Sequence, residues 1–356
     1  MSSNSVASKP AKSFPVQWLK SLAPGLGILV ALVLGSVLLA LSGANPLQAY
    51  QELLLGAFGG TRQLTETLLK TTPILIIALG LAIAFKARVW NIGAEGQYHI
   101  GALLGGWVAL TFSALPSMLL IPLMLVAGGL GGFLWSGLAG LLHLKRGVNL
   151  IICTLMLNYI GILLVQYAAR VPLRDPNGFL PESAKFVVAA RLPRLGDSRL
   201  HIGVLLAFVL VGLAYVLLWR TTLGFQLRAV GAKLSVAKWI GIKTGQSILT
   251  ALLISGTLAG LAGVIEVSAT YTRLKPSISD GYGFTGILVA LLGQLHPVSV
   301  CVAAVLFSAL EVGAQGLNVS LQIPAAIAGV LQALLVLGVL AGQAIALGDR
   351  SSNSAT

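Results

Sequence analysis

The sequence predicts an all-α polytopic membrane protein with about ten transmembrane helices, some of them discontinuous. Two observations predict it: 56% of the 356 residues are hydrophobic, and only 9% are charged. A soluble domain carries about 25% charged residues, whereas a helix that crosses a bilayer needs about 20 mostly apolar ones. With a mean hydropathy of +0.92, the composition excludes a water-soluble enzyme, a nucleic-acid-binding protein and a disordered chain.

Apolar stretches with few charges mark the expected spans, because runs of about 18 or more such residues are typical of transmembrane helices. The run at 282–295 is short for a crossing and is followed by His296 and Pro297, so we expect half of a broken helix there. The first run exceeds the signal-peptide core of about 7 to 15 residues, so we expect it to remain in the mature chain. The ten expected spans are 22–42, 71–87, 92–113, 117–142, 148–169, 200–219, 247–269, 282–295, 298–315 and 321–347.

The distribution of charge predicts the orientation. With the N-terminus inside, the inner segments hold thirteen cations and one acid, and the outer segments hold ten cations and six acids. Cytoplasmic loops are enriched in Lys and Arg, so we expect both termini to be cytoplasmic. The chain then divides into a cytoplasmic tail at 1–20, a transmembrane domain at 21–347 and a cytoplasmic tail at 348–356. The net charge of +13 marks topology rather than nucleic-acid binding.

One long outer loop and one long inner loop are expected. The outer loop, 170–199, is rich in proline and basic residues. It is either a docking surface for an external partner or a solvated connector, since long loops in compact proteins are often functional. The inner loop, 220–245, has five cations and no acid, and its apolar residues recur every three or four positions. This pattern predicts a short amphipathic helix on the membrane surface, which could simply bind anionic headgroups.

The inner loop resembles the cytoplasmic coupling loop of ABC-importer permeases, in the branch that serves branched-chain amino acids, simple sugars and nucleosides. In that family the loop docks on the ATPase subunit and transmits its closure to the membrane domain as a rigid-body shift. The positions that carry the resemblance, and the coupling role that it implies, are Gly224, Arg228, Ala229, Gly231, Ala237, Gly241 and Ile242.

Three further strings resemble the nucleoside, guanosine-type permeases of this branch: NIGAEGQ at 91–97, LMLNYI at 155–160 and GYGFTGILVALLG at 281–293. The matches extend from about Pro73 to Leu340. The resemblance implies a multi-pass permease subunit in the bacterial inner membrane that imports nucleosides or simple sugars. It also implies partners: a separate ATPase that uses ATP and Mg, a second permease chain (a paralogue or a copy of this one) and an external substrate-binding lipoprotein.

Polar residues within the apolar spans are candidates for the substrate pathway, because such residues are costly in a membrane and usually face a bundle interior or a cavity. Glu95 stands between two glycines that permit a broken helix, a common way to build a transport site. The alternative is a structural role, such as pairing with Lys86 or Arg88 or capping a helix. Interhelical hydrogen bonding is likewise an alternative for the amides. The candidates are Asn91, Glu95, Gln97, Asn158 and Tyr159.

Other chemistry is not expected of this chain. There is no GxxxxGK[ST] phosphate loop, so an ATPase must be another polypeptide, and no GxSxG, HExxH or paired-Asp pattern indicates an intramembrane enzyme. The alternative function is an ion-coupled secondary transporter that uses Glu95, Glu266 or Glu311 as its proton or ion site. For Glu266 and Glu311 we favour structural pairing. The four histidines have no companions at ligand spacing, and the two cysteines lie in apolar stretches, so we expect no metal site and no cofactor.

Overall fold

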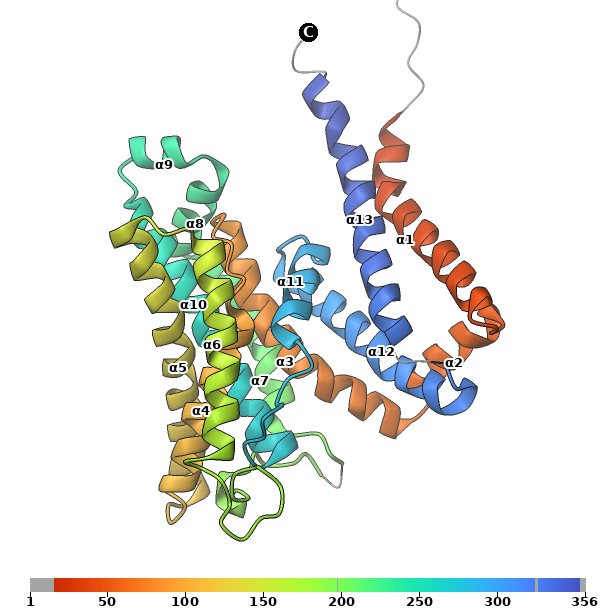
Figure 1. Cartoon of the computed structure of the whole chain (residues 1–356). Helices are drawn as coiled ribbons and strands as arrows, with labels where there is room; N and C mark the ends of the chain where they lie inside the picture. Colours follow the sequence, from red (N-terminus) through yellow and green to blue (C-terminus); the bar gives the residue numbers. More distant parts are fainter. Residues whose placement is uncertain (1–15, 197, 324–325, 353–356) are drawn as a thin grey trace, which may run out of the picture. The chain divides into compact units, whose positions relative to one another are not determined.

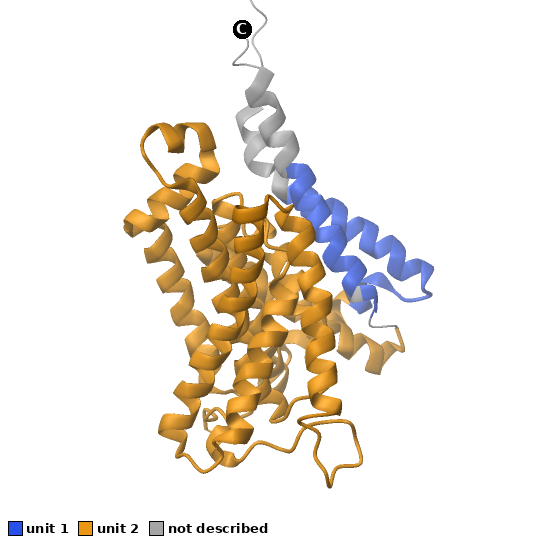
Figure 2. Ribbon diagram, turned by 60° about the vertical axis from the view of Figure 1, so that its left-hand side comes forward, with its two compact units in different colours: residues 1–49, 326–356 blue, residues 50–325 orange. Residues whose placement is uncertain are grey.

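The computed structural model describes residues 16–196, 198–323 and 326–352, and its regular elements there are helices (Figure 1). Two compact units are distinguished, residues 1–49 with 326–356 and residues 50–325 (Figure 2). The expected tails at 1–20 and 348–356 lie largely outside the described residues. Residues 16–20 and 348–352 belong to helices.

The first unit is a pair of long helices, α1 (Val16–Leu41) and α13 (Ala326–Ser352). They meet where two glycines face each other, since a methyl group on Gly27 would lie 1.9 Å from the carbonyl oxygen of Gly338. Ala31 and Leu39 of α1 are buried. Small residues that let two backbones approach are a common way to join helices in a membrane.

The second unit is built around α3 (Thr61–Lys86), which is buried on all sides from Thr71 to Phe85. A helix that is apolar around its whole circumference is a core helix. It packs against α7 (Ile202–Arg220), α10 (Thr244–Glu266), α11 (Tyr282–Leu292) and α12 (Pro297–Leu321). Chain segments far apart in sequence therefore share one core helix.

Glycine contacts join α4 (Ala94–Thr111), α5 (Ser117–Arg146) and α10 into one cluster in which each helix packs against the other two. A methyl group on Gly101 would lie 2.3 Å from Gly260, and one on Gly132 would lie 1.9 Å from the carbonyl oxygen of Gly256. No side chain fits between these backbones. The GGLGG sequence at 128–132 is thus explained by direct backbone contact between helices.

The remaining helices complete the second unit. α6 (Leu150–Arg170) begins at Asn149, whose side chain accepts hydrogen bonds from the nitrogens of Ile151 and Ile152, a common N-cap. α2 (Pro46–Phe58), which starts in the first unit, precedes α3. α8 (Thr222–Ala232) and α9 (Leu234–Trp239) lie at the opposite end of the bundle from the 171–201 loop (Figure 1).

Each of the ten expected spans overlaps a helix, but among the described residues only six helices are long and apolar enough to cross a membrane, or seven if the broken pair Gly25–Leu41 and Pro46–Phe58 counts as one. The expectation of all-α spans is confirmed; the count of ten is not. α11 has only 11 residues, as its flanking His-Pro predicts. α3 starts ten residues earlier than expected, because the charges of its first turns find partners on other segments.

The 171–201 loop is ordered against the segment after α10, apart from Asp197, which lies outside the described residues. Backbone hydrogen bonds join Ser183 to Leu274 and Phe186 to Thr272, and Phe186 is buried. Glu182 forms an ion pair with Arg273 at 2.8 Å. The prolines and charges of this loop thus belong to a fixed cap on this end of the unit.

Candidate functional site

A break between α3 and α4 places the NIGAEGQ string. α3 ends at Lys86, Arg88 adopts a left-handed φ of 57°, and α4 begins only at Ala94. Such a φ is uncommon for a residue with a side chain and is costly unless neighbouring contacts fix it. The break thus separates two expected spans, 71–87 and 92–113, and its buried backbone groups need partners from elsewhere.

Asn158 of α6 supplies those partners. Its side-chain oxygen accepts a hydrogen bond of 2.7 Å from the nitrogen of Gly96, in the first turn of α4, and its side-chain nitrogen donates at 2.6 Å to the carbonyl oxygen of Ile92. One turn earlier on α6, the hydroxyl of Thr154 accepts from the nitrogen of Ile92 at 3.2 Å. The α4 helix is therefore capped by a neighbouring helix rather than by its own N-cap residue, Gly93.

Asn91 and Gln97 pair with each other across the same break. Each side-chain amide both donates to and accepts from the other, at 2.9 and 3.0 Å, and Asn91 also donates to the hydroxyl of Ser255 on α10. The oxygen of Asn91 additionally accepts from the nitrogen of Gly93. Both side chains are buried, so these bonds fix the break to α10.

Glu95 is also buried, and it points to the first turn of α11. Its carboxylate accepts a hydrogen bond of 2.6 Å from the nitrogen of Gly283, and its other oxygen lies 3.8 Å from the ring of His99. A negative charge near a helix N-terminus is favourable. Gly283 is required, because a methyl group there would lie 2.4 Å from the nitrogen of Glu95. Asn91, Glu95, Gln97 and Asn158 are therefore brought together around the start of α4.

The other embedded candidates lie apart from this cluster. Tyr159 is 59% exposed on the outer surface of α6. Glu311 of α12 forms an ion pair with Lys70 of α3, and the same ammonium group lies 3.9 Å from Asp280. Glu266 is buried at the end of α10, next to the single π-turn Val267–Tyr271. In the described part of the chain, no three His, Cys, Asp or Glu side chains are grouped to hold a metal ion.

The inner loop forms two short helices that pack on the bundle through glycine. A methyl group on Gly224 of α8 would lie 2.0 Å from the carbonyl oxygen of Leu217, and one on Gly231 would lie 1.8 Å from that of Lys86. Leu227, Val230 and Ala237 are buried beside them. Both glycines lie inside α8, where they permit close packing. Arg228, next to Ala229 on α8, lies over the ring of Trp219 at 5.9 Å.

Gly241 ends α9 with φ of 83°. Its nitrogen donates to the carbonyl oxygen of Lys238, and the nitrogen of Ile242 donates to that of Ala237, which is the Schellman arrangement that terminates helices. The surface of this loop that faces away from the bundle combines exposed cations, Lys233 and Lys238, with exposed apolar side chains. Its exposed apolar members, the outer face of α9, are Leu234, Val236, Trp239 (89% exposed) and Ile240.

Sequence reasoning missed three members of the α4 cluster: Thr154, Ser255 and Gly283. Thr154 lies four residues before Asn158, so a helical wheel of α6 places the two on one face. Gly283 stands inside the 281–293 string, whose glycines were a signal of close packing. Ser255 carried no signal, because a serine in an apolar helix is usually satisfied by its own backbone.

The comparisons with known proteins agree with the resemblance of the motifs. The family model described as branched-chain amino acid transport system, permease component, matches residues 63–340. A glucose ABC transporter permease protein of Haloferax volcanii is 35% identical, covering 92% of this chain and 89% of that protein. A guanosine ABC transporter permease protein of Bacillus subtilis is 33% identical, over 91% and 94%. A nucleoside ABC transporter permease protein of Lactococcus lactis is 31% identical, over 84% and 85%.

Proposed function

Because this chain belongs to the family of branched-chain amino acid transport system permease components, we infer that it is the membrane-spanning permease subunit of an ABC importer for nucleosides or simple sugars. Relatives named as guanosine, nucleoside and glucose permeases support both substrate classes. The chain is a multi-pass protein of the plasma membrane, and it acts as a transport subunit that works with an ATPase and a substrate-binding protein.

We propose ten crossings with both termini in the cytoplasm. This orientation puts the basic loop at 220–245 inside and the cap at 170–199 outside, in agreement with the enrichment of Lys and Arg in cytoplasmic loops. α8, α9 and the cap lie at opposite ends of the second unit (Figure 1), which this topology requires. The proposed permease domain is 21–347, with cytoplasmic tails at 1–20 and 348–356.

Two features of the inner loop support the coupling role: α8 is packed tightly on the bundle, and α9 exposes apolar side chains. Gly224 and Gly231 hold α8 against the ends of α7 and α3, whereas the outer face of α9 exposes Trp239 and its apolar neighbours. An exposed tryptophan with a large apolar area is a frequent anchor of protein interfaces. The ATPase, which uses ATP and Mg, would bind this face and move the attached helices as a rigid body.

The other proposed partners are a second permease chain, either a paralogue or a copy of this one, and an external substrate-binding lipoprotein. The fixed cap at 170–199 is the surface that we assign to the lipoprotein, because its side chains Phe179, Leu180 and Val188 are exposed and apolar. Exposed apolar side chains on an ordered outer loop favour an interaction site over a solvated connector.

For the substrate pathway we retain Asn91, Glu95, Gln97, Asn158 and Tyr159 as candidates. Asn91 and Gln97 bond to each other, and Asn158 bonds to the backbone of Gly96 and Ile92. We therefore propose that these three amides fix the shape of the pathway next to the substrate rather than bind it directly. An ion-coupled secondary transporter that uses Glu95, Glu266 or Glu311 is the alternative. Glu311 is already paired with Lys70, and the family favours the ABC importer.

Replacement of Trp239 tests the coupling role. In vesicles reconstituted with the partner subunits, Trp239→Ala should weaken ATPase binding and lower ATP-dependent uptake of labelled nucleoside by tenfold or more, since interface anchors commonly contribute about 2 kcal/mol or more. Phe179→Ala, an equally exposed aromatic residue at the opposite end, is the matched control and should bind the ATPase normally. Full ATPase binding after deletion of 225–242 would refute the assignment. Uptake that survives ATP depletion and stops when the proton gradient collapses would instead support the secondary transporter.

A further inference from the structure

Two cavities of opposite character meet at one residue of α10. The first, of about 310 Å³, is lined by apolar side chains of α3, α5, α7 and α10, and the second, of about 410 Å³, lies between α8 and the start of α10. Thr250 lines both. We propose that together they bind one phospholipid, with an acyl chain in the apolar cavity and an anionic headgroup in the polar one.

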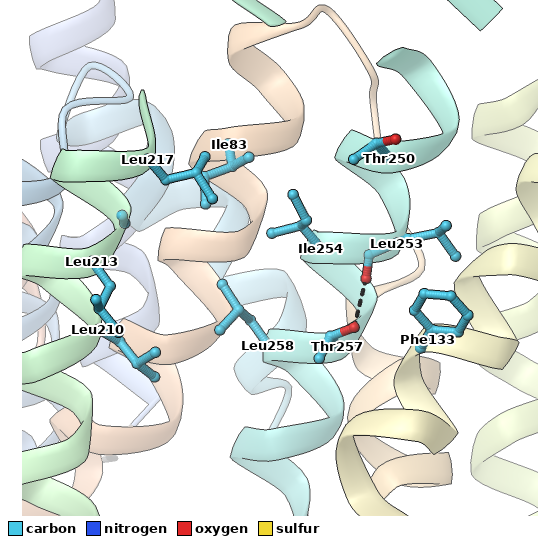
Figure 3. Close-up of a pocket in the computed structure, with 11 residues that line it drawn as sticks. Ile83, Phe133, Leu210, Leu213, Leu217, Thr250, Leu253, Ile254, Thr257 and Leu258 are labelled. Carbon is cyan, nitrogen blue, oxygen red and sulfur yellow. Dashed lines mark hydrogen bonds between the residues drawn. The ribbon is translucent and has the colours of Figure 1, made fainter. Parts of the chain in front are cut away.

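The apolar cavity fits an acyl chain in chemistry and length. Leu210, Leu213 and Leu217 of α7 face Ile254 and Leu258 of α10 across it (Figure 3). The hydroxyl of Thr257 donates to the carbonyl oxygen of Leu253 at 2.8 Å, so it does not need a polar ligand. From Thr250 to Leu258 the helix rises about 12 Å, close to the depth of one leaflet in a hydrocarbon core about 30 Å thick.

The polar cavity fits an anionic headgroup. Lys243, Gln246, Ser247 and Gln226 line it, and no carboxylate of the described residues lies within ion-pair distance of Lys243. The sequence has no acidic residue anywhere between Asp197 and Glu266. Leu223 and Leu227 of α8 form part of the same wall and continue the apolar lining toward Thr250. A charged surface next to an apolar slot in a membrane matches an anionic phospholipid.

The source of the anion follows from the same geometry. A soluble phosphate would occupy only the polar cavity, and the apolar cavity would then be filled by unspecific bilayer lipid. A zwitterionic phosphatidylcholine would fill the apolar cavity but gain little from Lys243. Only a lipid with a net negative headgroup uses both cavities. The site adjoins α8, whose other end packs on Lys86 of α3, so the bound lipid would contact the loop to which we assign ATPase coupling.

The test is a lipid titration of the purified full-length chain, with no ATPase or substrate, so its failure would leave the proposed transport function intact. Native mass spectrometry should show one phosphatidylglycerol bound at least fivefold more tightly than phosphatidylcholine. Lys243→Gln should remove this preference, and Leu213→Trp, which fills the apolar cavity, should weaken both lipids at least fivefold. Lys238→Gln on the same loop and Val216→Trp on the same helix are the matched controls, because neither residue lines either of these two cavities.

The outcomes that overturn the proposal are distinct. Equal binding of the two lipids to the unmodified chain, or an effect of the control variants as large as that of the cavity variants, would refute the site. Displacement of phosphatidylglycerol by millimolar inorganic phosphate would assign the polar cavity to a soluble anion instead. Unchanged binding by Leu213→Trp, with an unchanged melting temperature, would show that no acyl chain occupies the groove.

Discussion

The carboxylate of Glu95 accepts a hydrogen bond from the backbone nitrogen of Gly283, 2.6 Å away across 188 positions of sequence. The bond joins the first turn of α4 to the first turn of α11, and both residues belong to strings that resemble one family. The two strings are far apart along the chain, but their residues contact each other in the folded protein.

Gly283→Ala should destabilise this contact strongly. The added methyl group would lie 2.4 Å from the nitrogen of Glu95, and overpacking of a filled site costs about 1 to 3 kcal/mol. We expect a lower melting temperature of the purified protein in detergent, by several degrees. Gly212→Ala is the control, since nothing lies within 4 Å of that position. Equal melting temperatures for the two variants would show that the helices separate easily.

Asn158→Ala should lower stability more than it changes substrate recognition. It leaves the nitrogen of Gly96 and the carbonyl oxygen of Ile92 without their partner, and a buried unsatisfied group costs about 1 to 3 kcal/mol. We expect a lower melting temperature and less uptake at every substrate concentration, with the KM of uptake unchanged. Tyr159→Phe, on the neighbouring exposed position, should leave the melting temperature unchanged. A rise in KM with normal stability would instead place Asn158 in the substrate site.

Gly231→Ala should separate the inner loop from the bundle. A methyl group would lie 1.8 Å from the carbonyl oxygen of Lys86, so α8 has to move away from the end of α3. We expect ATP hydrolysis by the assembled complex to continue while substrate uptake falls at least tenfold, because the ATPase still binds but no longer moves the helices. Gly245→Ala is the control, because its nearest neighbour is a side-chain atom 3.5 Å away. Parallel loss of hydrolysis and uptake would indicate that the ATPase no longer binds.

His201 should make the outer end of the second unit sensitive to acid. Burial lowers the pKa of His201 from 6.5 to about 4, and neither ring nitrogen has a hydrogen-bond partner among the described residues. The unfolded chain binds a proton below pH 6.5 that the folded chain refuses, so stability falls as pH drops from 6.5 to 4, by up to about 1.4 kcal/mol per pH unit. The melting temperature of His201→Phe should fall less over this range, whereas His143→Gln should follow the unmodified protein. A parallel decline for His201→Phe would contradict the prediction.

The sequence predicted the positions of the helices well because most of the apolar runs are long enough to identify a helix by themselves, although the short run at 282–295 forms a helix of only 11 residues. The boundaries that charged residues suggested were less predictable. Glu66 and Lys70 were expected in an outer loop, but both lie in α3, where Glu66 pairs with Arg199 and Lys70 pairs with Glu311. Such partners lie far away in sequence, and no local pattern reveals them.

The candidate site was predictable only in part, because its hydrogen bonds also join segments that are far apart in sequence. The glycines on both sides of Glu95 indicated a broken helix, but α4 includes Glu95 and Gly96 without interruption, and the break lies before it, at 87–93. The capping of α4 by the side chain of Asn158 depends on where α6 lies relative to α4, and the apolar periodicity of the sequence does not determine that position. Glu95 and Asn158 became candidates because each lies in a string that resembles the same family. The hydrogen bonds show why the two strings occur in one protein: their residues meet at the start of α4.

The backbone contacts among α4, α5 and α10 limit how an importer of this kind can change shape. At Gly101, Gly132 and Gly260 the helices approach so closely that any larger side chain turned toward the contact would meet a backbone atom at about 2 Å. Rotation of one of these helices about its own axis is therefore blocked. The three helices must move as a single rigid group, and the opening and closing of the pathway has to occur where this group meets other helices or another subunit.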